Sequence, residues 1–215
     1  MTQNPTRWYD RIAFLYDPFI LGVYNRARRV TAEHLRLEPG HRVLDLACGT
    51  GENFRYILPE IGPSGVLVGA DYSQGMLAQA RRKVSRAGWE NVHLLHADAQ
   101  MITLDEISTA ASLPAQPFDF AQDRPFDRVL ITLGLTVIPD WQAAFERAWG
   151  MLTPGGRMTL MDGHVPERTW WTPIVDAIAA SDIQRHWWEP LEARVDDFAK
   201  VRLFPGMIYV VSGSK

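Results

Sequence analysis

Three short segments carry residues that could bind a nucleoside. The small residues Ala47-Cys48-Gly49-Thr50-Gly51 follow an apolar stretch at 42–46, and glycine lets a backbone turn sharply beside a ligand. Asp71 ends a second apolar stretch, where a carboxylate can accept hydrogen bonds from both hydroxyls of a ribose. Asp98 follows a third stretch, where its carboxylate can accept from the amino group of an adenine. Together the three segments predict a nucleoside site with no phosphate partner.

The loop at 47–51 does not match the common phosphate-binding patterns. No Gly-Lys-Ser/Thr follows it, as a phosphate loop requires. Counted from Gly49, the dinucleotide-binding G-x-G-x-x-G pattern needs a third glycine where this sequence has Phe54, which disfavours a nicotinamide oxidoreductase. A structural alternative is that Asp71 and Asp98 cap the helices that follow. Two acids and a glycine loop at three successive turns favour the ligand.

The elements that must position these residues alternate between strands and helices. Apolar runs predict strands at 42–46, 66–71, 92–96, 126–132 and 158–161. Helical periodicity predicts helices at 52–61, 73–86 and 141–152. Such alternation indicates βαβ units in a doubly wound, mostly parallel sheet, which binds ligands beyond the carboxyl ends of its strands. A last strand at 207–211 is expected to form a hairpin with the segment before Phe204.

The whole chain, 1–215, is expected to form one domain. We predict an N-terminal helical cap over 1–38, a cofactor-binding core over 39–162, and C-terminal helices with a hairpin over 163–215. Pro117-Phe118-Asp119 recurs as Pro125-Phe126-Asp127, and only the second copy is needed to begin a strand. The stretch 104–125 is therefore predicted to be a surface insertion.

Composition narrows the class of protein further. The chain has 215 residues, 47% of them hydrophobic, a net charge of −3 and a single cysteine. These values fit a globular domain without intramolecular disulfides, and they argue against a dedicated nucleic-acid binder, which usually carries a basic excess. The polar start leads into no apolar signal core, and no apolar stretch is long enough to span a membrane. We therefore expect a cytoplasmic protein.

The segments described above resemble the class I S-adenosylmethionine-dependent methyltransferases over residues 42–161. The glycine loop, Gly69-Ala70-Asp71, Ala97-Asp98-Ala99, the fourth strand and Leu152-Thr153-Pro154-Gly155-Gly156 occur in the family's order. The resemblance implies a Rossmann-like α/β fold, in which a doubly wound, seven-stranded, mostly parallel sheet carries N-terminal cap helices and a C-terminal β-hairpin. It also implies S-adenosylmethionine as cofactor and S-adenosylhomocysteine as its product.

The resemblance also assigns residues to parts of the cofactor. The glycine loop would meet the methionine part and Asp71 the ribose. The residues implied at the adenine are Tyr72, Met76, Asp98 and Ala99, and those near the sulfonium are Thr132 and Leu133. The full implied cofactor set adds Asp45, Ala47, Cys48, Gly49, Thr50, Gly51 and Asn53. Ala47 departs from the pattern, since many members have glycine there; Cys48 is expected to be a small buried filler.

Two features resemble methyltransferases whose acceptors partition into membranes. The doublets Tyr9-Asp10 and Tyr16-Asp17 look like those of quinone C-methyltransferases. Residues 135–141 look like the segment after the fourth strand in bacterial phospholipid and betaine-lipid N-methyltransferases. We expect methyl transfer to a small, lipid-like acceptor such as a phospholipid or betaine-lipid amine, with a quinone carbon or a soluble metabolite as alternatives. Tyr16 is the candidate catalytic residue facing the methyl group, and a packed core aromatic is the other interpretation of it.

Other possibilities stay open at this point. Basic and aromatic residues near the N-terminus, with Trp170-Trp171 and Trp187-Trp188, could form a peripheral membrane face or pack on the sheet. No metal is expected, although Asp162 and His164 follow the fifth strand. Aminocarboxypropyl transfer from the same cofactor and a non-catalytic cofactor-binding protein are alternatives of another class. The sequence does not indicate an oligomeric state.

Overall fold

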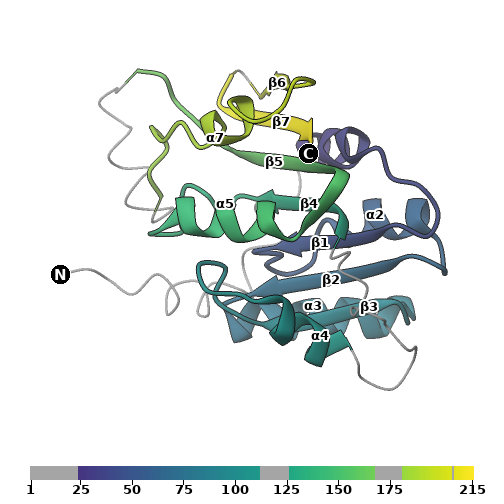
Figure 1. Cartoon of the computed structure of the whole chain (residues 1–215). Coiled ribbons are helices and arrows are strands. Elements are labelled where there is room, and N and C mark those ends of the chain that lie inside the picture. The colour runs from purple at the N-terminus through teal and green to yellow at the C-terminus, as the bar shows by residue number, and fades with distance from the viewer. Residues whose placement is uncertain (1–23, 112–125, 168–180, 205) are drawn as a thin grey trace.

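The computed structural model describes residues 24–111, 126–167, 181–204 and 206–215. Within them, seven strands form one sheet in the order β3-β2-β1-β4-β5-β7-β6 (Figure 1). Their bounds are β1 Arg42–Leu46, β2 Val66–Asp71, β3 Val92–His96, β4 Phe126–Thr132, β5 Leu152–Gly163, β6 Ala199–Leu203 and β7 Ile208–Ser214. Strands β3, β2, β1, β4 and β5 are parallel, and β7 runs antiparallel between β5 and β6. The predicted seven-stranded, mostly parallel sheet and its C-terminal hairpin are confirmed.

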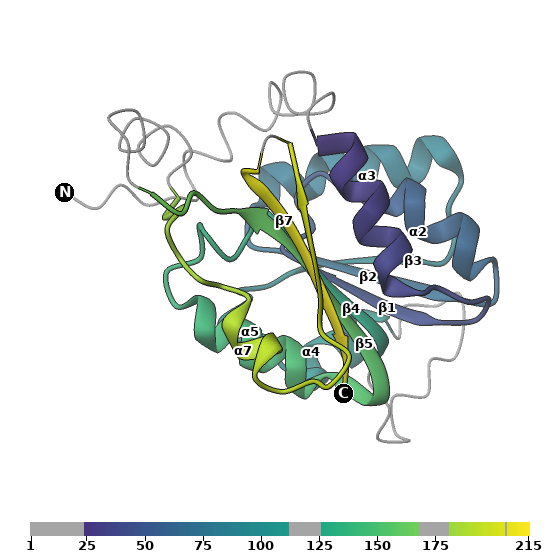
Figure 2. The same ribbon diagram turned by 90° about the horizontal axis from the view of Figure 1, so that it is seen from above.

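Helices cover both faces of this sheet (Figure 2). One face carries the helix at 24–35, called the cap helix below, with α2 (Phe54–Ile61) and α3 (Gln74–Ala87). The other face carries α4 (Leu104–Ala111), α5 (Trp141–Gly150) and α7 (Glu189–Glu192). The central strands β1, β2 and β4 are therefore mostly buried, which is why they read as nearly continuous apolar runs.

Alternation along β1 shows how one strand serves both layers. Val43 packs into the core beneath α2 and α3, whereas Leu44 and Leu46 pack into the core beneath α5. Successive side chains of a strand point to opposite faces, so these three residues join the two cores. Asp45 points with Val43 toward the helical layer that carries α2.

The boundary between α5 and β5 differs from the predicted one. The helix ends at Gly150, and β5 already begins at Leu152, opposite Phe126. The ladder resumes only at Arg157, opposite Arg128, so residues 153–156 form a bulge within the strand. Gly155 has a φ of 77° there, a left-handed conformation that glycine adopts without strain.

The expected surface insertion at 104–125 must be corrected at its start. Residues 104–111 form α4, and Ile107 of this helix is fully buried in the core. Thr103 and Glu106 form its N-terminal capping box, because each side chain accepts from the other residue's backbone N–H, at 3.3 and 2.8 Å. This helix therefore covers the sheet. Residues 112–125, and residues 168–180 of the region expected to hold the C-terminal helices, lie outside the described residues.

The C-terminal end of the cap helix is fastened to the sheet by a buried arginine. Arg157 of β5 is 3% exposed and donates to the His34 carbonyl oxygen at 2.7 Å. It also donates to the hydroxyls of Ser212 and Ser214, at 2.8 and 2.9 Å, and to the carboxylate of Asp197. A guanidinium presents five donors in a rigid fork, so a single residue joins a helix end, an edge hairpin and the central sheet.

Arg157→Met should therefore destabilise the fold strongly. The substitution removes the donor to the His34 carbonyl and to two hydroxyls, and removes the cation beside Asp197, whose side chain is partly exposed. Leaving buried acceptors without a donor costs about 1–3 kcal/mol each. Urea denaturation followed by tryptophan fluorescence measures the loss in free energy of unfolding. Arg82→Met, at an exposed position of α3, is the matched control and should change stability by less than about 0.5 kcal/mol. A similar small change for Arg157→Met would contradict this role.

Candidate functional site

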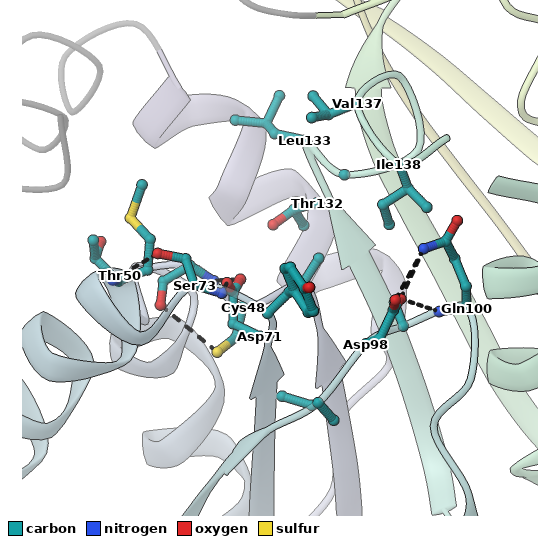
Figure 3. Close-up of a pocket in the computed structure, with 18 of the residues that line it drawn as sticks. Cys48, Thr50, Asp71, Ser73, Asp98, Gln100, Thr132, Leu133, Val137 and Ile138 are labelled. Carbon is teal, nitrogen blue, oxygen red and sulfur yellow. Dashed lines mark hydrogen bonds between the residues drawn. The ribbon is translucent and has the colours of Figure 1, made fainter. Parts of the chain in front are cut away.

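A cavity of about 320 Å³ opens at the carboxyl ends of β1, β2, β3 and β4. The loops after these four strands supply most of its walls (Figure 3). Eleven of the fourteen residues expected to bind the cofactor line it: Ala47, Cys48, Gly49, Thr50, Asp71, Tyr72, Met76, Asp98, Ala99, Thr132 and Leu133. The other three, Asp45, Gly51 and Asn53, are buried and are not part of the cavity wall.

The loop after β1 has a backbone that only small residues fit. Ala47, Gly49 and Gly51 have φ values of 59°, 56° and 77°, in the left-handed region that disfavours a Cβ atom. A Cβ on Gly51 would lie 2.6 Å from the ring of Phe54, and one on Gly69 of β2 would lie 2.8 Å from it. The Phe54 ring thus fills the space under the loop. This packing role accounts for a phenylalanine at the position where the dinucleotide-binding pattern has its third glycine.

Asp71 connects the glycine loop to the start of α3. One of its carboxylate oxygens accepts from the Gly49 N–H at 2.7 Å and the other from the Ser73 N–H at 2.8 Å. The N-cap of α3 is Ser73, whose hydroxyl accepts from the Met76 N–H. The alternative that Asp71 caps this helix is therefore wrong. Its carboxylate lines the cavity instead, and each oxygen can accept more than one hydrogen bond.

Asp98 is organised by a residue that the sequence did not single out. Gln100 donates its backbone N–H and its side-chain amide to the Asp98 carboxylate, at 2.9 to 3.1 Å. The Gln100 amide oxygen accepts from the Asp140 N–H at 2.9 Å. Because Thr103 and Glu106 cap α4, the helix-cap alternative for Asp98 is also wrong. Gln100 thereby ties this end of the cavity to the start of α5, as Figure 3 shows for the Asp98–Gln100 contacts.

A buried polar network lies at the β4 side of the glycine loop. Asn53 donates to Asp45 and to the Thr132 hydroxyl, each at 2.9 Å, and its amide oxygen accepts from Arg28 at 2.8 Å. Asp45 is fully buried, and its second oxygen has no hydrogen-bond partner in the described part of the chain. Burial raises the pKa of Asp45 to about 7, and the hydrogen bond from Asn53 only partly offsets this.

The cavity wall after β4 is apolar. In Figure 3, Leu133, Val137 and Ile138 lie together beyond Thr132, on one side of the cavity. The backbone of this loop is tied to β5, since Thr136 donates through its hydroxyl at 2.8 Å and its N–H at 3.1 Å to the buried Asp162. Desolvation raises the pKa of Asp162 to about 6.

Sequence reasoning missed part of the cavity wall. Arg28 lies on the cap helix, and its basic type at a helical position gave no signal of its own. Glu52, Ser73 and Gln100 immediately follow or precede predicted residues, so a wider window around each turn would have included them. The remaining lining residues that were not predicted are Ala70, Ala97, Gly134, Val137, Ile138 and Pro139.

Several other expectations concern the surroundings of the cavity. Tyr16 and Trp170-Trp171 lie outside the described residues. Trp187 is fully buried and Trp188 is 7% exposed, so this pair packs on the sheet and does not form a membrane face. No helix in the described ranges is long and apolar enough to cross a membrane. The same ranges contain no cluster of three metal-ligating side chains.

Asp45 should make stability depend on pH. Its pKa of about 7 in the folded state exceeds an unfolded value of about 3.9, so the folded state binds more protons between these limits. The free energy of unfolding should therefore fall as pH rises from about 4 to about 7, by at most about 1.4 kcal/mol per unit from this residue.

Asp45→Asn removes this titration, and denaturant unfolding at several pH values measures it. The decline should become shallower in the variant, leaving the smaller contribution expected from Asp162. Parallel wild-type and variant profiles between pH 4 and 7 would show that Asp45 does not titrate in this range.

Comparisons with known proteins agree with this geometry. A family model described as a methyltransferase domain matches residues 43–156. The demethylmenaquinone methyltransferase of Listeria monocytogenes (serotype 4a, strain HCC23) is 32% identical over 150 residues, which are 70% of this chain and 56% of the relative. That of Bacillus cytotoxicus is 30% identical over 139 residues, 65% of this chain and 52% of the relative. The chain thus spans about half the length of these relatives.

Solved structures support the same fold. Phosphoethanolamine N-methyltransferase 2 of Haemonchus contortus, in complex with S-adenosyl-L-methionine, matches with a TM-score of 0.73 at 16% identity, covering 98% of this chain and 58% of that one. A SAM-dependent methyltransferase of Aquifex aeolicus matches at 0.64 and 18% identity, covering 95% and 97%. On the matched domain and the sheet order, the chain belongs to the class I S-adenosylmethionine-dependent methyltransferases.

Proposed function

We propose that this protein transfers the methyl group of S-adenosylmethionine to a small apolar acceptor, and that the methylated atom is a ring carbon of a quinol. The apolar character of the cavity wall after β4 is the observation that supports this class of acceptor. Its described side chains at the cavity, Leu133, Val137, Ile138 and Pro139, offer no carboxylate that would attract an ammonium group. A planar apolar ring suits such a wall better than the amine of a lipid headgroup does. The relatives at 32% identity, named for demethylmenaquinone, support the same class.

The cavity fits the cofactor at three places. Asp71 ends β2 and its carboxylate lies against the glycine loop, a position from which it could accept hydrogen bonds from ribose hydroxyls. Asp98 and Gln100 together present acceptor and donor groups for the edge of an adenine, and Tyr72 and Met76 would flank its faces. One carboxylate oxygen of buried Asp45 has no hydrogen-bond partner among the described residues. A negative charge in this part of the site, near Thr132, would attract the ammonium group on the cofactor's methionine part.

The protein's own contribution to the reaction is alignment and exclusion of water. The cofactor supplies a methyl group already activated by positive sulfur. Asp71 and Asp98 would hold the nucleoside, and Thr132 and Leu133 would lie at the sulfonium end. The apolar side chains after β4 keep the acceptor face dry and hold a nucleophile in line with the methyl group, which converts a bimolecular step into an oriented one.

Asp71→Ala should weaken binding of S-adenosylhomocysteine by about 100-fold. The change removes a charged acceptor for two ribose hydroxyls, and hydrogen bonds to charged groups contribute about 1.5–3 kcal/mol each. Isothermal titration calorimetry measures the affinity, and the melting temperature checks that the variant still folds without the Gly49–Asp71 hydrogen bond. Asp105→Ala, at an exposed position of α4, is the control and should bind normally. Normal binding by a folded Asp71→Ala protein would refute the ribose assignment.

The acceptor class can be tested with S-adenosylmethionine labelled in its methyl group. The protein would be incubated separately with reduced demethylmenaquinone, with phosphatidylethanolamine vesicles and with an aqueous cell extract. We expect label in the quinol alone. Label in the phospholipid would replace the quinol with a lipid amine, and label only in the aqueous extract would indicate a soluble acceptor. Release of methylthioadenosine instead of S-adenosylhomocysteine would indicate aminocarboxypropyl transfer.

A further inference from the structure

A single arginine from the C-terminal part of the chain holds the loop between β4 and α5. The Nη1 atom of Arg185 donates to the Leu135 carbonyl oxygen at 2.9 Å and to the Ile138 carbonyl oxygen at 2.7 Å. These two carbonyls stand at either end of a short turn, so the guanidinium spans it. Because the Arg185 side chain is only 20% exposed, both hydrogen bonds are largely shielded from water.

The backbone on both sides of Arg185 is fastened to the rest of the fold. The Asp182 N–H donates to the Thr136 carbonyl oxygen at 2.7 Å, which gives the loop after β4 a third contact with this segment. Trp187 is fully buried, and its indole N–H donates to the Gly163 carbonyl oxygen at 3.0 Å. The arginine therefore reaches the loop from a fixed position.

Arg185 and Asp162 satisfy opposite groups of the same loop. Asp162 accepts from the N–H and the hydroxyl of Thr136, whereas Arg185 supplies donors to carbonyl oxygens. Backbone N–H and carbonyl groups both need partners when they are removed from water, so the two side chains together fix the path of the loop. Val137 and Ile138, which line the cavity, lie within the stretch held in this way (Figure 3).

We propose that Arg185 is a positioning residue that holds the apolar wall after β4 in the shape that binds the methyl acceptor. The proposal rests on the proposed function, in which this wall lies against the acceptor. Arg185 is not among the described residues that line the cavity, so it acts on the acceptor only through Val137 and Ile138. Asp71 and Asp98, proposed to hold the nucleoside, follow other strands, and binding of the cofactor should not depend on Arg185.

Steady-state kinetics with reduced demethylmenaquinone separate this role from a general loss of structure. Arg185→Leu removes the donor to both carbonyls, and KM for the quinol should rise about 10-fold. The value of kcat should stay near that of the wild type, because the wall binds the acceptor in the ground state and the transition state alike. Affinity for S-adenosylhomocysteine, measured by calorimetry, should be unchanged.

Three further variants sharpen the comparison. Arg185→Lys should keep most of the wild-type KM, since both hydrogen bonds come from one nitrogen and an ammonium group also carries several donors. Arg185→Gln, whose shorter side chain should not reach both carbonyls, should raise KM as Arg185→Leu does, and it serves if the leucine variant does not fold. Arg147→Leu, at an exposed position of α5, is the matched control and should behave as wild type.

Hydrogen–deuterium exchange tests the hold on the loop directly. The N–H groups of Val137 and Ile138 donate to the Gly134 carbonyl oxygen, at 3.1 and 2.8 Å. Without the Arg185 contacts the turn should open more often, and these amides should exchange about 10-fold faster in Arg185→Leu. The lysine variant and the control should exchange as slowly as the wild type.

Several results would overturn the proposal. An unchanged KM in folded Arg185→Leu would do so even if the loop amides exchange faster. Parallel losses of affinity for the quinol and for S-adenosylhomocysteine, or no rescue by lysine, would assign Arg185 a general structural role. Wild-type protein that methylates phosphatidylethanolamine or an aqueous acceptor instead would contradict the proposed quinol alone, and KM would then be compared for that acceptor. Melting temperatures establish which variants fold.

Discussion

The left-handed backbone of residues 47–51 is the constraint on which the rest of the site depends. Three positive φ values in five residues turn the chain from β1 toward α2 and aim the Gly49 N–H at Asp71. The ring of Phe54 supports the loop from below and leaves no room for a Cβ on Gly51 or Gly69. The Asp71 carboxylate is thus oriented by a loop that packing and backbone hydrogen bonds hold in shape, and Ala47 bears the conformational cost of a left-handed residue that is not glycine.

Two buried arginines join the cap helix to this sheet, and they differ in their hydrogen-bond and ionic partners. Arg157 is satisfied within the chain, by a carbonyl, two hydroxyls and a carboxylate. Arg28, at the cavity, meets only the neutral groups of Asn53 and Thr132. The end of the helix at His34 is therefore held by an arginine with an ionic partner, whereas Arg28 is connected to the buried Asp45 only through Asn53.

Sequence patterns predicted the elements correctly where a run of apolar residues is also a buried strand of the folded sheet. Strands β1 to β4 begin and end at the predicted residues because strands buried on both faces must be apolar throughout. The end of α5 was predicted two residues late, since Leu152 continues the helical periodicity although it pairs with Phe126. Residues 104–111 were taken for part of an insertion because an eight-residue helix with one core residue leaves little pattern. Arg28 was missed because only the tertiary fold brings it to Asn53 and Thr132.

The cavity has acidic residues after β2 and β3 and a group of apolar side chains after β4, and this difference bears on the nucleophile. Asp71 and Asp98 lie on the side of β2 and β3, whereas Leu133, Val137 and Ile138 form the side of β4. Methyl transfer from a sulfonium to an anionic nucleophile neutralises charge, and a dry, low-dielectric wall strengthens the attraction between the two reactants. Transfer to a neutral amine only moves the positive charge onto nitrogen, which an apolar wall does not stabilise. The wall after β4 therefore favours a quinol ionised to its phenolate, with charge delocalised onto ring carbon, over the amine of a lipid headgroup.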